Sequence, residues 1–534
     1  MSSPSSTRSA VAAAVVASAA LYWAVMRRRA VAKAAARAAA PPMYVSTRGA
    51  LSGVPPSAMG LSPQTGQPGV SFEYAVMQGL AANGGLFVPQ RVPKGDVEGW
   101  RNLSFPQLAL EIMSLFVPAE TCTRQELERL VKASYGANFR DSRITPVVGL
   151  DKEQVEVLEL FHGPTWAFKD VALQFLGNLF EHILAKRTGD DARITVLGAT
   201  SGDTGSAAIH GLRGKHGVEC FILFPEGRVS PIQERQMTTI PDKNVHCVAI
   251  RGTFDDAQDI VKAAFNDREF QGRHRLAAVN SINWARILAQ VTYYFFAYYE
   301  LQRQGKSVDK LVFVVPTGNF GDVLAGYYAK RMGLPVHKFV VATNENDILH
   351  RFFMNGTYSR RDVAVTTTPS MDICVSSNFE RFLYHMLEED PKRIEGMMRK
   401  FAEQKEFSVS DEELKRCRAE MVSARASQNE VKETMRRVFS ADSYLLDPHT
   451  AVGVAGAKEL RDSGVLPKDA RVVCLATAHW AKFTAAAVEA VGEKAVQDLY
   501  PAELKALEGL TPRKVVVDAT YPHVRQEMEK VLGR

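Results

Sequence analysis

The fold of this chain is indicated most clearly by residues 194–212, which read ITVLGATSGDTGSAAIHGL. The first six residues are apolar or small and include β-branched side chains, as expected for a buried strand. A turn rich in glycine and hydroxyl side chains follows, and residues 206–212 then have the pattern of a helix. A buried strand, a glycine-rich turn and a helix in this order predict one unit of a parallel α/β sheet.

Five further runs are continuously apolar rather than alternating, which indicates strands buried on both faces. They are residues 221–224, 245–250, 311–315, 339–342 and 472–476. Helical stretches such as residues 284–302 lie between most of them. Strands separated by helices imply a parallel sheet covered on both faces, and ligands in such folds bind beyond the carboxyl ends of the strands.

The turn at residues 316–322 reads PTGNFGD and lies between a predicted strand and a predicted helix. Glycines at such a junction let backbone N–H groups converge on an anion, and the helix dipole adds to the attraction. The turn matches neither GxGxxG nor GxxxxGKS/T, so neither a dinucleotide site nor a nucleotide-phosphate loop is predicted. An ordinary connecting turn is the alternative.

Two further turns carry polar side chains at strand ends. The turn at residues 200–205 offers the side chains of Ser201, Asp203 and Thr204 beside exposed amides. The turn after residues 472–475 contains Thr477, whose hydroxyl could bind a pyridine nitrogen. His479 in that turn is expected to be a packed or capping histidine, and so is His162.

The run FHGPTWAFKD, residues 161–170, places Lys169 where a loop passes into a strongly amphipathic helix. One lysine together with several anion-binding turns is what pyridoxal-phosphate chemistry requires, because the amine forms a Schiff base and the turns hold the phosphate and ring. A surface lysine at the start of a helix is the alternative, since buried lysines are rare. The three downstream turns favour the catalytic interpretation.

The charge of the chain is concentrated at its N-terminus. Residues 1–42 contain six basic residues and no acid, which equals the net charge of +6 for all 534 residues. The remainder is neutral, so no nucleic-acid surface is predicted. The six cysteines are scattered without CxxC pairs or zinc-ligand spacing, so no metal site is predicted, and buried free thiols in a reducing compartment are expected.

The first 42 residues have the composition of a leader. No acid precedes Glu73, and the stretch is rich in Arg, Ala and Ser, which is typical of organelle import signals, whether plastid or mitochondrial. The alternative is a signal-anchor at the uncharged residues 10–26 that leaves the body cytoplasmic, although seventeen residues is at the lower limit for spanning a bilayer. Residues 52–69, rich in Pro, Gly and Ser, are expected to form a linker or surface loop.

With these turns and the lysine run in one chain and in this order, the sequence resembles the threonine synthases of fungi and many bacteria. The resemblance starts at MYVSTRG (residues 43–49) and runs nearly to the C-terminus. It includes GGLFVP (84–89), GRVSP (227–231), NSINWAR (280–286) and DPHT (447–450). It departs at residues 1–42, which are additional, and at Trp480, which stands where proline usually follows Thr-Ala-His.

The resemblance implies a tryptophan-synthase β-like α/β fold (fold type II), with two parallel-sheet subdomains and a small N-terminal α/β domain. It implies a leader at residues 1–42, an N-terminal domain at 43–145, a catalytic domain at 146–490 and a C-terminal helical segment at 491–534. Pyridoxal 5'-phosphate is the implied cofactor. Lys169 matches the Schiff-base lysine, Gly318, Asn319, Phe320 and Asp322 match the phosphate turn, Thr477 matches the residue at the pyridine nitrogen, and Ser201, Asp203 and Thr204 match the loop facing cofactor and substrate.

The implied reaction converts O-phospho-L-homoserine and water to L-threonine and phosphate, the last step of threonine biosynthesis. Asn283 and Arg286 are candidates for the substrate phosphate, because arginine suits bidentate phosphate binding. Three alternatives stay open: a phosphohomoserine phospho-lyase, a serine/threonine dehydratase, and a silent membrane-anchored scaffold. Membrane contact is expected only through residues 10–26, and the oligomeric state, monomer or homodimer, is left open.

Overall fold

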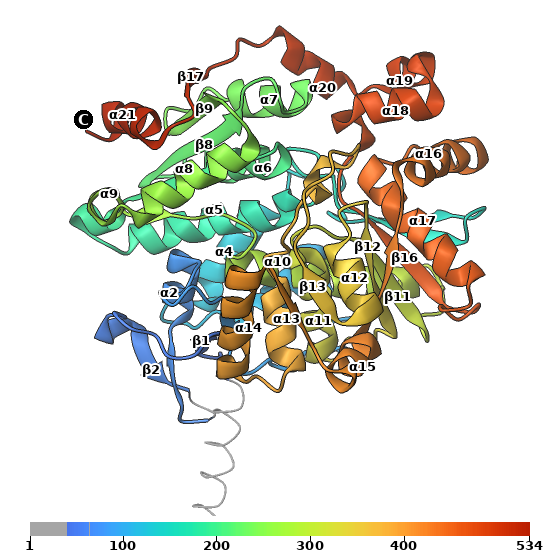
Figure 1. Ribbon diagram of the computed structural model, residues 1–534, viewed down its shortest axis with the longest axis horizontal. Coiled ribbons are helices and arrows are strands. Elements are labelled where there is room, and N and C mark those ends of the chain that lie inside the picture. The colour runs from blue at the N-terminus through green and yellow to red at the C-terminus, as the bar shows by residue number, and fades with distance from the viewer. Residues whose placement is uncertain (1–39, 63–64, 534) are drawn as a thin grey trace, which may run out of the picture.

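The computed structural model describes residues 40–62 and 65–533 of the chain (Figure 1). The leader predicted for residues 1–42 therefore lies almost wholly outside the described residues, and so does the apolar run at residues 10–26. Within the described ranges, no helix is both long enough and apolar enough to cross a membrane.

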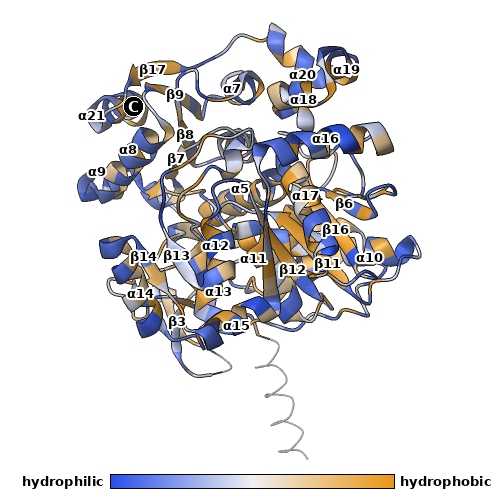
Figure 2. Cartoon of the chain, turned by 45° about the vertical axis from the view of Figure 1, so that its right-hand side comes forward, coloured by the Kyte–Doolittle hydropathy of each residue, from blue (hydrophilic) through white to orange (hydrophobic). Residues whose placement is uncertain are grey.

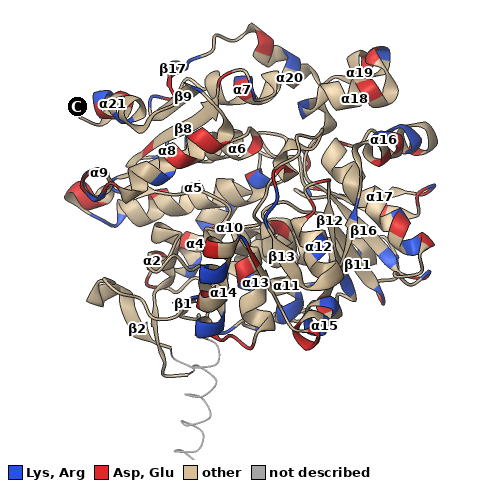
Figure 3. Cartoon of the chain, in the orientation of Figure 1, with Lys and Arg blue, Asp and Glu red and all other residues tan. Residues whose placement is uncertain are grey.

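Two parallel sheets form the body of the molecule, as the sequence predicted. The larger has the order β15 (Met421–Arg425), β12 (Lys338–Thr343), β11 (Leu311–Pro316), β16 (Arg471–Ala476), β6 (Val155–Glu159) and β5 (Val147–Leu150). The smaller has the order β10 (Leu276–Ala277), β7 (Ile194–Ala199), β8 (Val218–Pro225), β9 (Val245–Arg251) and β17 (Val515–Asp518). All neighbouring strands are parallel except β5 and β6, which run antiparallel. The strands are strongly apolar, and most charged side chains lie on helices and loops around them (Figures 2 and 3).

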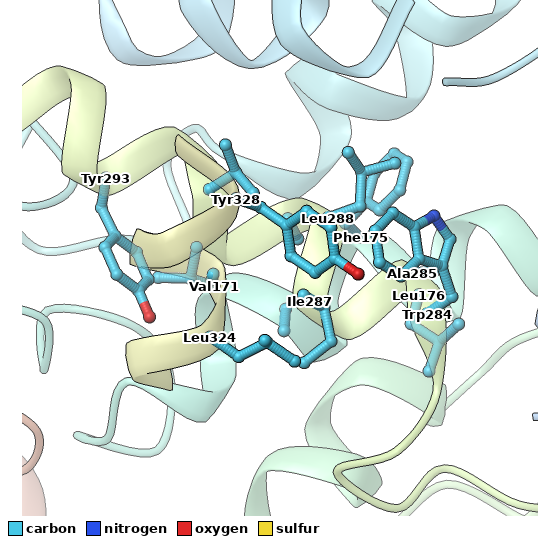
Figure 4. Close-up of a cluster of buried hydrophobic side chains, with 14 of the residues drawn as sticks. Val171, Phe175, Leu176, Trp284, Ala285, Ile287, Leu288, Tyr293, Leu324 and Tyr328 are labelled. Atoms are coloured by element: carbon cyan, nitrogen blue, oxygen red, sulfur yellow. The ribbon is translucent and has the colours of Figure 1, made fainter. Parts of the chain in front are cut away.

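Four helices follow the strands and turns that carry the predicted chemistry. They are α5 (Lys169–Ala185), α6 (Asp203–Leu212), α10 (Trp284–Arg303) and α11 (Gly321–Met332). Apolar side chains of α5, α10 and α11 pack together in the main core, where Figure 4 shows Phe175, Trp284 and Tyr328 among them. The aromatic stretch at residues 293–299 is buried inside this core, because α10 is covered on all sides. These contacts fix the start of α5, where Lys169 lies, relative to both sheets.

Further helices surround the two sheets, and some of them pack on other helices rather than on a sheet. They are α7 (Pro231–Thr238), α8 (Phe254–Asn266), α9 (Arg268–His274), α12 (Ile348–Asn355), α13 (Phe379–Met386), α14 (Pro391–Gln404), α15 (Asp411–Glu420), α16 (Gln428–Asp442), α17 (Pro448–Asp462), α18 (Thr484–Val491), α19 (Glu493–Leu499), α20 (Ala502–Ala506) and α21 (Tyr521–Leu532). Strands β13 (Thr357–Ser359) and β14 (Glu406–Ser408) form a separate antiparallel pair.

A small N-terminal sheet has the order β2 (Met59–Leu61), β3 (Pro68–Val70), β1 (Tyr44–Ser46) and β4 (Phe87–Pro89), followed by helices α3 (Phe105–Ser114) and α4 (Arg124–Ser134), with α2 (Phe72–Gln78) between β3 and β4. It is joined to α13 by the bidentate contact of Arg48 with Glu380 at 2.7 and 3.0 Å. Arg381, which is fully buried, donates to the carbonyl of Phe87 at 2.9 Å. The domain is therefore held against the body, next to the cavity described below.

Two sequence predictions are wrong in part. Residues 52–69 are not only a linker, because β2 and β3 pair within them through Gly60↔Gly69 and Leu61↔Pro68. The segment at residues 491–534 is not purely helical: after α20 the chain crosses the top of the molecule in Figure 1 and adds β17 to the edge of the smaller sheet. Val524 and Met528 of α21 are then fully buried against that sheet. A four-residue strand with an aspartate at its end carries too little pattern to predict from sequence.

Candidate active site

A cavity of about 790 Å³ lies at the carboxyl ends of strands from both sheets. It is lined by the ends of β7, β11 and β16 and by the start of α5, so the three predicted turns and the predicted lysine meet there. The N-terminal domain contributes residues 78 and 80–82 to its wall. Sequence elements more than 300 residues apart are therefore brought to one site, as expected for ligand binding beyond the carboxyl ends of parallel strands.

Lys169 is the first residue of α5, and its amine reaches the cavity. Its Nζ lies 3.4 Å from Oδ2 of Asp203, and its side chain is only 11% exposed. Burial lowers the pKa of Lys169 from its ordinary value; Asp203 opposes this effect, and the nearby cations Lys482 and Arg286 add to it. A lysine amine with a lowered pKa is available as a nucleophile and as a base.

The loop before Lys169 is held by the third turn. Phe168 donates its backbone N–H to the carbonyl of Thr477 at 2.8 Å, and His479 donates to the carbonyl of Trp166 at 3.0 Å. Trp166 has a φ of 62°, which is uncommon for a bulky side chain, and its ring is covered by Arg140 at 3.8 Å. A strained backbone conformation of this kind persists only where the surrounding structure imposes it. Here the backbone hydrogen bonds from the turn with Thr477 and the contact with Arg140 do so.

The turn at residues 316–322 forms a concave site for an anion at the start of α11. Phe320 has a φ of 64° and is the N-cap residue, so the backbone N–H groups of the turn and of the first helical turn converge. Its ring packs against Phe379 and Phe382, which leaves its backbone as the part available to a ligand. Gly318 is required by close approach, because a Cβ there would lie 2.9 Å from the carbonyl oxygen of Ser370. Asn319 lines the cavity and accepts a hydrogen bond from Ser377.

Asp322 lies in the first turn of α11 and is buried. Its Oδ1 accepts hydrogen bonds from the hydroxyls of Tyr293 at 2.6 Å and Tyr294 at 2.8 Å, whereas its Oδ2 has no partner among the described residues. Burial raises the pKa of Asp322 to about 6, although both tyrosines oppose the shift. The carboxyl group therefore has one free oxygen within a cavity-lining residue, where a ligand oxygen could contact it.

Thr477 also lines the cavity, at the end of β16. Trp480, the departure from the family pattern, is not among the lining residues: its ring packs against Tyr500 and His479 on the other side of the turn. The wall beside Thr477 is therefore not narrowed by the tryptophan. His479 accepts from the backbone of Ala481 and is buried, which lowers its pKa to about 3, as a packed and capping histidine requires.

The turn at residues 200–205 reaches the site through two side chains. Thr204 lines the cavity, and Asp203 contacts Lys169 as described above. Ser201 is only partly buried and is not among the lining residues. The placement is consistent with roles for Thr204 and Asp203, and it gives Ser201 no direct contact with the cavity.

The two candidates for a substrate phosphate differ. Asn283 is fully buried and does not line the cavity: it caps α10 by accepting from Ala285 at 3.0 Å and donates to the carbonyl of Val76 at 2.8 Å. Its assignment to the phosphate is therefore wrong, because its side chain is fully used in the helix start. Arg286 does line the cavity, and it donates from Nη1 to the carbonyl of Val279, while its Nε has no partner among the described residues.

Sequence reasoning missed four polar side chains beside the site: Gln233, Ser370, His449 and Lys482. Gln233, Ser370 and Lys482 contact Asp203. His449 lines the cavity and has its Nδ1 2.9 Å from Asp447 and its Nε2 accepting from Ser370 N–H. The DPHT and Ala-Lys-Phe strings that carry two of them were visible in the sequence, but nothing local marks them as buried.

Three side chains away from the cavity form a cluster with metal-ligand chemistry, which the sequence spacing had not indicated. The ligand atoms of Cys122, Glu126 and His182 lie within 4.8 Å of one another. The Glu126 carboxylate already accepts from Lys186 at 3.1 Å and from Thr123 at 2.8 Å. An ammonium at this carboxylate competes with a metal ion, so we assign no metal there.

The residues of the cavity fit pyridoxal phosphate. An amine for the Schiff base, a turn of converging N–H groups and a hydroxyl at Thr477 are in one cavity. The buried Nε of Arg286 and Oδ2 of Asp322 both have no hydrogen-bond partner among residues 40–62 and 65–533. A family model described as "Pyridoxal-phosphate dependent enzyme" matches residues 143–478. The fold and this site thus define the class as the pyridoxal-phosphate-dependent enzymes of parallel α/β fold.

Further comparisons narrow the class. Models described as "Threonine synthase N terminus" and "Threonine synthase, C-terminal" match residues 61–135 and 450–528. The chain is 50% identical to the threonine synthase of Schizosaccharomyces pombe over 79% of this chain and 87% of that protein. It is 47% identical to that of Saccharomyces cerevisiae over 89% and 97%. The chain belongs to the threonine synthase family.

Solved structures agree with this assignment. The crystal structure of threonine synthase from yeast superposes with a TM-score of 0.84 at 43% identity, covering 93% of this chain and 99% of that one. The threonine synthase from Brucella melitensis, whose structure has pyridoxal phosphate bound, has a TM-score of 0.82 at 41% identity and covers 92% and 100%. The chain is also 36% identical to the Xenopus laevis protein named "Threonine synthase-like 2" over 87% of this chain and 93% of that one.

Proposed function

We propose that this chain is a threonine synthase, which converts O-phospho-L-homoserine and water to L-threonine and phosphate in the last step of threonine biosynthesis. The observation that carries the proposal is one cavity that contains a buried lysine amine, an anion-binding turn and a second, buried cation at Arg286. Threonine synthase relatives at 47 and 50% identity span most of the chain on both sides of this cavity.

Pyridoxal phosphate, when bound, supplies an electron sink for the charge left at the substrate Cα and a Schiff-base carbon for its amine. Lys169 then has two tasks. Its Nζ holds the cofactor before substrate binds. Once the substrate amine has displaced Lys169, the same Nζ accepts the α-proton of the substrate. Burial supports both tasks, because it lowers the pKa of Lys169 and so favours the uncharged amine that both tasks need.

We assign the substrate phosphate to Arg286. Arg286 is 2% exposed, its Nε has no partner within the described part of the chain, and burial lowers the pKa of Arg286 to about 10. An anion that binds here pairs a buried cation, which makes its affinity larger than at an exposed arginine. The variant Arg286→Lys replaces the planar set of guanidinium donors with a single ammonium group. It should raise KM for phosphohomoserine by about tenfold or more. An unchanged KM would remove Arg286 from the phosphate site.

The deciding experiment gives the purified protein, trimmed before Met43, O-phospho-L-homoserine and measures phosphate, threonine and 2-oxobutyrate together. We expect equal amounts of phosphate and threonine. Phosphate with 2-oxobutyrate would mean that the chain is a phospho-lyase that does not add water at Cβ. Absence of phosphate release would favour a dehydratase or a silent scaffold, which serine and threonine as substrates would separate.

The matched variant is Lys169→Ala. It removes the only group in the cavity that we assign to the Schiff base, so both turnover and the visible absorbance of bound pyridoxal phosphate should be lost. Circular dichroism should be unchanged, because the variant removes a buried amine without opening the core. Retained turnover in a folded Lys169→Ala protein would overturn the role of this lysine.

A further inference from the structure

Lys482 is a fully buried lysine beside the active site. It ends the short helix η4 (Trp480–Lys482), which follows the turn that carries Thr477, and it has a relative exposure of 0%. A buried ammonium is tolerated only where it is paired and hydrogen-bonded. Lys482 meets this condition through two contacts, and each is with a group that lies next to Lys169 in space or in the loop before it.

The first contact is with Asp203. Nζ of Lys482 lies 2.8 Å from Oδ1 of Asp203, to which Gln233 also donates at 2.8 Å. The other oxygen, Oδ2, faces Nζ of Lys169 at 3.4 Å and accepts from the hydroxyl of Ser370 at 3.2 Å. One carboxylate is therefore shared by two amines, one on each oxygen, and the shorter contact belongs to Lys482.

The second contact is with the loop that precedes the Schiff-base lysine. Nζ of Lys482 donates to the carbonyl of Thr165 at 2.6 Å, and Gln236 donates to the same carbonyl at 3.1 Å. Thr165 in turn donates its N–H and hydroxyl to Asp170, the residue after Lys169. Lys482 thus contacts both the carboxylate that faces Lys169 and the backbone that leads into it.

We propose that Lys482 is a positioning residue for the reaction: its ammonium neutralises and orients Asp203, so that Lys169 can lose its proton beside a carboxylate. This inference rests on the proposed function of Lys169. Without Lys482, the unpaired carboxylate would hold Lys169 as an ammonium ion, which can neither form a Schiff base nor accept the α-proton.

The charges around Lys169 act in the expected directions. The groups that face it are Asp203 from α6, Lys482 from η4 and Arg286 from α10, while Asp170 lies next to it on α5. Burial alone would raise the pKa of Asp203, but Lys482 and Lys169 lower it far below its ordinary range, so it is ionised. Of the two lysines, Lys482 has the larger effect on Asp203, and its charge also lowers the pKa of Lys169.

The test measures the titration of Lys169 itself, in protein stripped of cofactor and without substrate. Trace acetylation with acetic anhydride at a series of pH values, followed by peptide mass spectrometry, reports the uncharged fraction of single lysines. Exposed Lys458 serves as the internal reference. In Lys482→Met, which keeps the side-chain length and removes the charge, acetylation of Lys169 at pH 8 should fall at least tenfold relative to wild type. In Lys482→Arg it should change much less.

A second comparison does not require Lys482→Met to fold. Asp203→Asn removes the carboxylate and keeps Lys482, and Asp203→Asn/Lys482→Met removes both partners, so neither variant buries an unpaired carboxylate. If Lys482 acts through Asp203, its removal should matter little once the carboxylate is gone, so the acetylation rates of Lys169 at pH 8 in these two variants should agree within about threefold. A difference of tenfold or more in this pair, or wild-type acetylation of Lys169 in folded Lys482→Met, would overturn the proposal. Since no turnover is involved, failure here is distinct from absence of threonine formation by the wild-type protein.

Discussion

At the scale of single residues, the site is a set of buried charges whose partners decide their state. Asp203 is paired with two amines and is ionised, whereas Asp322 is paired only with two hydroxyls, and burial raises its pKa to about 6. The same side-chain type therefore takes two roles within one cavity. The surroundings of each aspartate decide its pKa, because desolvation and neighbouring charges both shift the pKa of a carboxyl group.

We predict that Asp322→Asn stabilises the folded protein, whereas Asp322→Ala destabilises it. A raised pKa in the folded state means that Asp322 favours folding below its ordinary value of 3.8 and loses this advantage as pH rises through about 6. Asp322→Asn should therefore stabilise the cofactor-free protein at pH 8 by about 1–3 kcal/mol, and the gain should vanish near pH 4. Urea denaturation at both pH values measures it. A gain that does not depend on pH would contradict the assigned pKa.

Asp322→Ala should instead destabilise, because it removes the buried hydrogen bonds from Tyr293 and Tyr294 to the carboxyl group, each contributing about 0.5–1.5 kcal/mol, although each hydroxyl keeps one other acceptor. It should also weaken pyridoxal phosphate binding, which equilibrium dialysis measures. The double variant Tyr293→Phe/Tyr294→Phe is the control, since it keeps the carboxyl group. An unchanged cofactor affinity in Asp322→Ala would remove Asp322 from the phosphate site.

At the scale of elements, the strands and turns that surround the cavity were readable from the sequence, and β6 shows why a strand can be missed. β7, β8, β9, β11, β12 and β16 are continuously apolar and were predicted. β6 was missed because it contains Glu156 and Glu159, both buried. Their partners, including Lys306 at 2.5 Å and Tyr444 at 2.7 Å, lie about 150 and 285 residues further on. A charged residue indicates exposure unless its partner is known, so local pattern fails here.

The position of α5, and hence of Lys169, depends on close helix packing that only glycine permits. A Cβ on Gly177 of α5 would lie 1.9 Å from the carbonyl oxygen of Gly211 in α6, and backbone atoms cannot move aside. We predict that Gly177→Ala destabilises the protein by about 1–3 kcal/mol or more and lowers kcat, because α5 must shift. Gly396→Ala is the matched control: it lies within α14 with open space around it, so it should stabilise by about 0.4–1 kcal/mol. Thermal unfolding of both variants tests the contrast, and equal effects would contradict it.

At the scale of the whole molecule, the body of the chain contains the complete cavity. Its lining residues begin at Gln78 and end at Thr477, and β17 with α21 closes the smaller sheet from the far end of the chain. Acidic and basic side chains are interspersed over the helices of this body (Figure 3). The basic leader predicted for residues 1–42 lies almost wholly outside the described residues.

We propose that residues 1–42 serve targeting rather than catalysis. Protein that begins at Met43 should have the kcat and KM of the full chain within about twofold, because no lining residue precedes Gln78 in the described part of the chain. Residues 1–42 fused to a fluorescent protein should direct it to an organelle, with cleavage near Met43. An intact N-terminus in the membrane pellet would favour the signal-anchor, and a large loss of kcat would place the segment in the catalytic body.

The sequence by itself determined the class of fold, and it singled out Lys169 and the turn at residues 316–322 as candidates for the Schiff base and the cofactor phosphate. These features depend on local patterns: continuous apolar runs, glycines at strand ends and one lysine at a helix start. Only the tertiary structure decided the use of the polar side chains. It showed that Asn283 caps a helix, that Arg286 lines the cavity, and that Lys482 pairs with an aspartate 279 residues earlier in the chain. The reason is physical: the state of a buried charge depends on which groups lie within a few ångströms, and those groups come from distant parts of the chain.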